Sequence, residues 1–208
     1  MHVSLTSSGN AIIILTYLAL ALWSNNLRDT DAGLHRFYQA CVDAGPLACP
    51  IHESSAQKIH DRVQSLFNKL RSYPISFYNA ETMSYGRVDY SVLKQVMFAT
   101  LYKPYNTGKE LVSAIADLEQ GIAEPMYQLS EMKRAHNLLL EAHTCPVSPR
   151  DPSMPWRGNT LAIACGDGDP VQDGVDELRS YYEDMAESSM FADIWWPRIG
   201  CAYVRCLA

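Results

Sequence analysis

Apolar residues recur at helical spacing through the first two thirds of the chain, beginning near residue 30. The first such segment has its apolar positions at Leu34, Phe37, Tyr38, Cys41 and Val42. Gly45 and the proline after it predict the end of this helix. A second segment begins at Ser54, with Gln57 placed three residues later for a capping box, and ends before Pro74. The apolar stripe of this second predicted helix consists of Ile59, Val63, Leu66, Phe67 and Leu70.

The pattern changes from helical to extended after Pro74. Residues 75–78 are typical of a short strand, residues 79–86 of a turn, and residues 87–90 of a return strand. The sequence therefore predicts a small hairpin. Asp89 or Ser91 is placed to cap a third helix. Its apolar positions are Leu93, Val96, Met97 and Leu101.

Two more helical segments follow. Thr107 and Glu110 have capping-box spacing, which predicts that a helix begins there. The apolar positions of that fourth helix are Leu111, Ile115, Leu118 and Ile122. Gly121 and Pro125 separate it from a fifth helix. The stripe of the fifth helix is Met126, Leu129, Met132, His136, Leu139 and Leu140.

The composition changes at residues 144–158, where four prolines stand among polar residues. This stretch is typical of a linker. Residues 159–165 then form a continuous apolar run, which predicts a strand covered on both faces. A glycine- and aspartate-rich loop at 166–170 follows, and Asp173 is placed to cap a further helix.

These changes predict four regions in the chain. They are a hydrophobic leader at 1–22, a helical region with a small hairpin at 23–143, the linker at 144–158, and a strand-loop-helix unit at 159–208. A lone strand needs neighbours for its backbone hydrogen bonds. No other segment provides them, so we expect the strand-loop-helix unit to be part of an incomplete sheet domain.

The leader contains the apolar run Ala11–Trp23, which is shorter than the roughly 20 residues of a membrane-spanning helix. Its length and the Ala19-Leu20-Ala21 triplet fit a signal peptide, which predicts a secreted protein. The residues before the run include no Lys or Arg. A buried helix or strand and a membrane anchor therefore stay open as alternatives, and we expect membrane association only if the leader is retained.

Composition and charge exclude several partner classes. The chain has 208 residues, 48% of them apolar, and a formal net charge of -6. Because it has no long Lys/Arg run, a nucleic-acid partner is not expected. Its six cysteines include no CxxC pair, and His136 and His143 are seven residues apart rather than four. We therefore expect neither a metal site nor a cofactor.

Short stretches in a fixed order carry a family resemblance. They are Trp23–Asp31, Cys41–Pro46, Ala99–Pro104 with its Leu-Tyr-x-Pro ending, Ala162–Asp167 and Gly200-Cys201. Together they resemble the fungal tripeptidyl-aminopeptidase-like serine hydrolases of the α/β-hydrolase superfamily. The resemblance implies a helical cap inserted into a sheet domain, and substrates that are peptides or small esters and amides. In that family the nucleophilic serine precedes the cap, and the acid and histidine follow the strand after it.

The resemblance implies a fold class that is mainly α with a few short strands. In this view the chain consists of a helical cap plus a strand-loop-helix piece of an incomplete α/β-hydrolase core. No G-x-S-x-G motif occurs, and the nearest stretch, Thr82–Gly86, lacks the first glycine around Ser84. All six histidines precede the strand-loop unit. We therefore assign no catalytic residue and expect the chain to be inactive alone.

Two other functions stay open at this point. One is an active hydrolase that uses a non-standard site of Ser84, Asp167 or Asp169, and a histidine. The other is a helical binding module tethered to a membrane by the leader. Asp167 follows the predicted strand, where ligand-binding loops gather in α/β sheets, so it is our candidate for binding substrate or aligning the cap. A glycine-flanked aspartate also commonly closes a turn or caps a helix, and this structural role is the one we favour.

Disulfides are the remaining site prediction. Cys41 and Cys49 are close enough in sequence to close a small loop, and the resemblance implies that pair and a second one between Cys165 and Cys201. Cys145 and Cys206 have no assigned partner. Buried free thiols stay the alternative if the chain is not exported.

Overall fold

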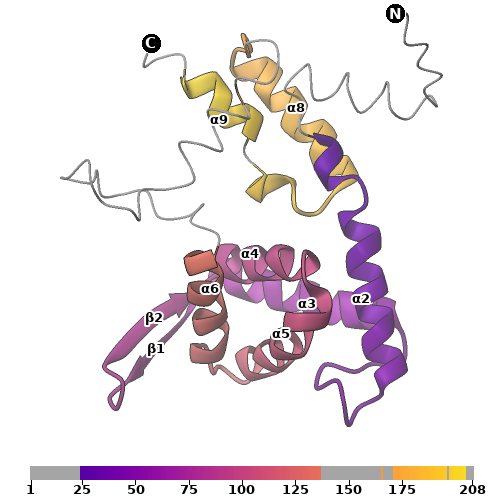
Figure 1. Ribbon diagram of the computed structural model, residues 1–208, viewed down its shortest axis with the longest axis vertical. Coiled ribbons are helices and arrows are strands. Elements are labelled where there is room, and N and C mark those ends of the chain that lie inside the picture. The colour runs from indigo at the N-terminus through magenta and orange to yellow at the C-terminus, as the bar shows by residue number, and fades with distance from the viewer. Residues whose placement is uncertain (1–23, 137–164, 166–170, 196, 205–208) are drawn as a thin grey trace, which may run out of the picture. The chain divides into compact units, whose positions relative to one another are not determined.

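The computed structural model describes residues 24–136, 165, 171–195 and 197–204 (Figure 1). The chain divides into two compact units. One is Thr30–Glu141, here called the helical unit, and the other combines Met1–Asp29 with Ala142–Ala208. The only sheet among the described residues has two strands, and nearly all other regular structure is helical. The predicted fold class, mainly α with a few short strands, is therefore confirmed.

Five helices lie in the described part of the helical unit. They are α2 (Thr30–Ala44), α3 (Ala56–Ser72), α4 (Tyr90–Leu101), α5 (Pro104–Glu119) and α6 (Glu124–His136). Gly45 follows α2 with φ of +77°, a conformation that glycine adopts without strain, so it ends the helix as predicted. All five predicted stripe residues of α3 are buried.

A hairpin of β1 (Ile75–Asn79) and β2 (Ser84–Val88) connects α3 to α4. The hairpin is confirmed, but β2 begins at Ser84, three residues before the predicted return strand. The two strands pair antiparallel and project from the helices of the unit (Figure 1). One face of the hairpin packs on α6, where the rings of Phe77 and Tyr127 lie 5.2 Å apart. A Cβ atom at Gly86 would come within 2.8 Å of both rings, so glycine permits this close approach.

The core of the unit lies between the helices. It includes the α3 stripe together with Leu93, Met97, Leu111, Ile115, Leu118 and Met126. Tyr38 of α2 is also buried, and its hydroxyl has no hydrogen-bond partner among the described residues. Burial raises the pKa of Tyr38, so this phenol stays neutral at physiological pH.

Two predicted helix starts in the helical unit are wrong, by one and by three residues. Helix α3 is capped by Ser55 rather than Ser54, because the Ser55 hydroxyl accepts the Lys58 backbone N–H at 3.3 Å. Helix α5 begins at Pro104 instead of Thr107. Proline suits the first helical position, since its fixed φ is helical and no N–H is needed there. Asp89, in contrast, caps α4 as one of the two predicted choices.

The second unit contains η1 (Ser24–Leu27), α8 (Val175–Ser188), η2 (Ala192–Ile194) and α9 (Pro197–Val204). Helix α8 is capped by Gly174, not by Asp173 as predicted. The Asp173 carboxylate instead accepts two hydrogen-bond contacts from Arg198 of α9, at 2.6 and 2.7 Å. The predicted strand at 159–165 lies outside the described residues except for Cys165, whose backbone is helical, so no strand reaches that residue.

Candidate functional site

The strongest candidate nucleophile in the helical unit, Ser84, belongs to a polar cluster around Glu124. Its hydroxyl donates to Glu124 Oε1 at 3.2 Å and lies 2.7 Å from Thr82 Oγ1. The amide of Asn79 donates to both oxygens of the same carboxylate, at 3.0 and 3.1 Å. Gln128 adds a further contact at 3.2 Å. The carboxylate at the start of α6 therefore binds both ends of the hairpin turn.

Among the histidines whose side chains the structure describes, none takes part in this cluster. Of the histidines whose side chains are described, His35 is exposed, and His52 and His60 are half-buried. The ring of His60 packs edge-on against Tyr38, with centroids 6.1 Å apart. Within the described part of the chain, the hydrogen bonds of Ser84 go to Thr82 and Glu124 alone. A serine nucleophile of the triad type requires a histidine base at hydrogen-bond distance, and Ser84 has none among these residues.

Asp167, the sequence's candidate for substrate binding, lies outside the described residues, as do Asp169 and the loop around them. The nearest described residue on its N-terminal side is Cys165, which forms a disulfide with Cys201. Cys201 and Val171 are buried in one small cluster against which Cys165 packs. This disulfide is one of the two that the sequence resemblance implies.

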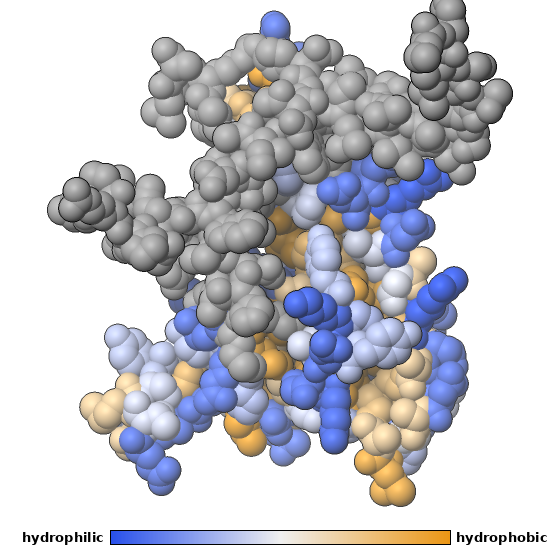
Figure 2. Space-filling model, viewed as in Figure 1, coloured by the Kyte–Doolittle hydropathy of each residue, from blue (hydrophilic) through white to orange (hydrophobic). Residues whose placement is uncertain are grey.

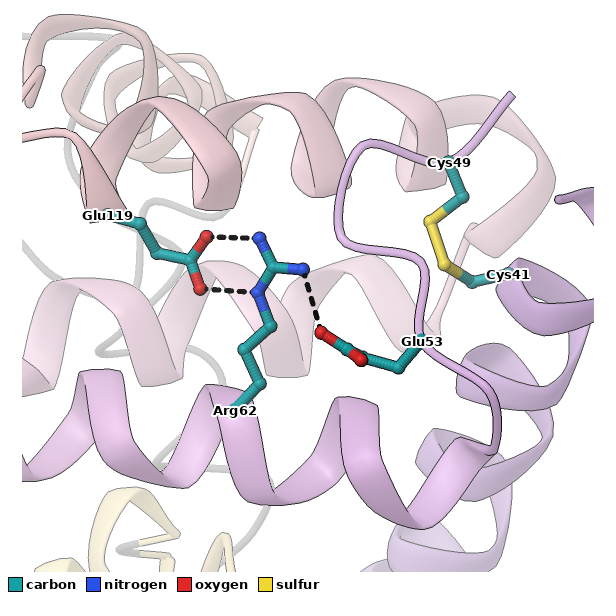
Figure 3. Close-up of polar contacts among 5 residues, drawn as sticks. All are labelled: Cys41, Cys49, Glu53, Arg62 and Glu119. Carbon is teal, nitrogen blue, oxygen red and sulfur yellow. Dashed lines mark hydrogen bonds and ion pairs between the residues drawn. A yellow bond between two sulfur atoms is a disulfide. The ribbon is translucent and has the colours of Figure 1, made fainter. Parts of the chain in front are cut away.

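The second implied disulfide, Cys41–Cys49, is also present, and it closes the loop after α2 (Figure 3). Both cysteines are buried. Leu47, inside the closed loop, is fully exposed. The disulfide therefore ties the end of α2 to the segment that leads into α3.

Arg62 links three segments of the helical unit a short distance from this loop (Figure 3). Its Nε and Nη2 donate to the two carboxylate oxygens of Glu119 at 2.8 and 2.6 Å, a bidentate pair between α3 and α5. Its Nη1 contacts Glu53 at 3.3 Å, before α3 begins. The hydrogen bonds to Glu119 raise the pKa of Arg62, despite some opposing desolvation. The pair is half-buried and joins the interior of α3 to the last residue of α5.

The Leu-Tyr-x-Pro stretch forms the junction of α4 and α5. Tyr102 is 67% exposed, with its ring edge-on to Phe98 at 5.5 Å, and Tyr105 is 100% exposed. Pro104 starts α5 between them. The junction therefore presents two aromatic side chains to solvent, next to a third that is half-buried.

Metal-ligand clusters and membrane-spanning helices are two further features that would indicate function in the described residues. In that part of the chain, no group of three or more His, Cys, Asp or Glu side chains could hold a metal ion. None of its helices has the length and apolar character needed to cross a membrane. Comparison of the chain with family models, curated proteins and solved structures gives no match.

Sequence reasoning missed the carboxylate that organises the Ser84 cluster and the partner of Arg62. Glu124 is 40 residues from Ser84, and Glu119 is 57 residues from Arg62. No local spacing rule connects residues so far apart. The alternation of residues 84–88, in contrast, is a signal that could have shown which side chains of the hairpin share a face.

Proposed function

We propose that the helical unit is the cap of a serine hydrolase of the tripeptidyl-aminopeptidase-like type. In this role it covers an active site and contacts the apolar parts of a peptide, amide or ester substrate. It contributes shape and apolar contact rather than a nucleophile or a base.

The observation that carries this proposal is the aromatic junction of α4 and α5. Exposed apolar and aromatic side chains that cluster on a surface often mark the place where a ligand or another domain binds. Tyr102 lies in the stretch that resembles the cap of the family, and Tyr105 directly follows it. Helices α4 and α5 hold the two rings at the ends of well-packed helices. The Arg62–Glu119 pair and the Cys41–Cys49 disulfide support a rigid cap, because they fix α5 and the entry to α3.

The position and hydrogen bonds of Ser84 also support the cap proposal. Acyl transfer by this fold uses a serine on a strand-to-helix turn, a histidine that removes its proton, and backbone N–H groups that bind the oxyanion. Ser84 instead begins an exposed hairpin strand and donates its hydrogen bond to a carboxylate. Its position is explained by the attachment of the hairpin to α6, without any catalytic role.

A fluorophosphonate probe, which reacts with activated serines, tests this proposal directly. We expect the purified full chain to stay unmodified under conditions that label a serine hydrolase control completely. Intact-mass spectrometry gives the extent of labelling, and peptide mapping gives the modified residue. A Ser84→Ala variant is the matched control, and its mass shift should equal that of the parent chain.

Labelling of Ser84 that the alanine variant abolishes would contradict the proposal. It would favour the alternative, an active hydrolase with a non-standard site. The location of the imidazole that activates Ser84 would then be sought by single replacements of the six histidines.

A further inference from the structure

The solvent-facing side of the hairpin carries an ordered array of four side chains. Ser76 lies directly opposite Arg87 in the strand register, and Tyr78 lies opposite Tyr85. Alternation along the strands places all four on the same face, away from the face that packs on α6. The array therefore has two rows. Tyr78 and Tyr85 form the tyrosine row, and Ser76 and Arg87 form the polar row beside it.

The tyrosine row is open to ligands. Tyr78 is 63% exposed and Tyr85 is 76% exposed. Neither ring stacks on another aromatic ring in the described part of the chain, and the Tyr78 hydroxyl contacts only Met83 Sδ there, at 3.5 Å. Figure 2 shows hydrophilic and hydrophobic residues side by side on the projecting hairpin, at the lower left. Such a surface suits a ligand that is itself part apolar and part polar.

The polar row has unused hydrogen-bond donors. The Arg87 side chain is 65% exposed, and its one contact with the described residues is a long one, from Nη2 to Asp89 Oδ2 at 3.5 Å. The other guanidinium N–H groups face no protein acceptor among those residues. The Ser76 hydroxyl likewise makes no hydrogen bond to them. Arginine presents its donors as a planar fork that matches a carboxylate.

A hollow joins the two rows. Its volume is about 570 Å³, and its lining includes Ser76, Tyr85, Arg87, Asp89 and Val92. Small-ligand sites commonly occupy about 300–1,000 Å³. The hollow is wide open to solvent, so it has room for an amino-acid-sized group but encloses little of it.

The negative charge of Asp89, which lines the hollow, repels an anion at this site. Its Oδ1 accepts the Val92 N–H at 3.0 Å at the start of α4, so part of its charge is compensated by the helix end. Attraction of an anion must therefore come from directed hydrogen bonds of Arg87 and Ser76 rather than from net charge. This requirement selects a carboxylate that can bind the free side of the guanidinium.

We propose that this face of the hairpin binds a carboxylate that carries a flat apolar group. The two rows are two residues apart along the strands, or about 6–7 Å. An arylalkyl carboxylate spans the rows, with its ring on Tyr85 and its carboxylate on Arg87 and Ser76. Such a group occurs in a free arylalkanoic acid and in the C-terminal phenylalanine of a peptide. The site is separate from the aromatic junction of α4 and α5 and does not depend on the cap proposal.

Binding of three matched probes to the full chain tests this site. The probes are 3-phenylpropionate, acetyl-Ala-Phe with a free carboxylate, and the same dipeptide as its C-terminal amide. Nuclear magnetic resonance of ¹⁵N-labelled arginine side chains follows the Arg87 Nε–H. We expect both acids to shift this signal and the amide to bind about tenfold more weakly, since it cannot form charge-assisted hydrogen bonds. Tighter binding of the dipeptide acid assigns the site to peptide C-termini, and tighter binding of 3-phenylpropionate assigns it to free acids.

Variants separate a specific site from nonspecific attraction. Because Arg87 is itself the reporter, variant affinities are measured by ligand-detected saturation transfer. Arg87→Gln should weaken binding of the acids about tenfold, and Arg87→Lys should give an intermediate loss because it keeps the charge without the fork. Tyr85→Ala should also weaken binding of the acids severalfold. The control variants Tyr73→Ala and Lys109→Gln, at exposed positions, should leave this binding unchanged. Equal binding of the acid and the amide, or unchanged affinity in a folded Arg87→Gln variant, would overturn the proposal.

Discussion

Truncation of Phe67 to alanine is expected to lower the free energy of unfolding of the helical unit by about 3–5 kcal/mol. Phe67 is 2% exposed and lies in the middle of the α3 stripe. Its ring meets that of Tyr90 edge-on, with centroids 5.3 Å apart, and so connects α3 to the start of α4. The variant loses the burial of a whole ring and leaves a cavity that the surrounding helices fill only partly.

Urea unfolding followed by circular dichroism measures this effect. Leu47→Ala is the matched control, because it removes an apolar side chain that is fully exposed in the disulfide loop. The control should change the free energy of unfolding by less than about 0.5 kcal/mol. A loss below about 1 kcal/mol for Phe67→Ala would mean that α3 and α4 do not pack as described.

Removal of the Cys41–Cys49 disulfide is expected to cost about 2–3 kcal/mol of unfolding free energy. The bond closes a short loop, so it restricts the unfolded chain modestly, and both cysteines are buried in the native unit. Replacement of both by alanine also removes buried sulfur contacts between the end of α2 and the segment before α3. The loss is measured by denaturant unfolding of the double variant beside the parent chain.

Reduction gives an independent check on the disulfide. In a strong thiol reductant, the helical unit of the parent chain should lose about as much stability as in the double variant, because the other disulfide, Cys165–Cys201, belongs to the second unit. If neither replacement nor reduction changed the stability of the helical unit, the disulfide would have no structural role in it.

The helices and the hairpin could be predicted because their signals are local. An apolar stripe at helical spacing identified α3 apart from its cap, and the change to alternation after Pro74 identified β1. Asp89, one of the two predicted choices, caps α4, and it stands where the strand pattern gives way to the helical one. Both disulfides were implied by the family resemblance rather than by spacing, and both are present.

The errors arise where several residues compete for one role or where a distant partner decides. Ser54 and Ser55 can both cap a helix, and only the backbone geometry selects Ser55. Asp173 has the chemistry of a cap, but Arg198, which lies 25 residues later, binds its carboxylate. The Glu124 cluster depends in the same way on a hairpin and a helix that meet through tertiary packing. These contacts follow from packing between elements, which periodicity within one element does not contain.

The cap proposal implies that the helical unit contacts substrates but performs no chemistry on them. The most direct measurement is the release of p-nitroaniline from Ala-Ala-Phe-p-nitroanilide by the purified full chain. The proposal predicts no release above the buffer rate, and no difference between the parent chain and Ser84→Ala. Sustained release by the parent chain that Ser84→Ala abolishes would contradict it.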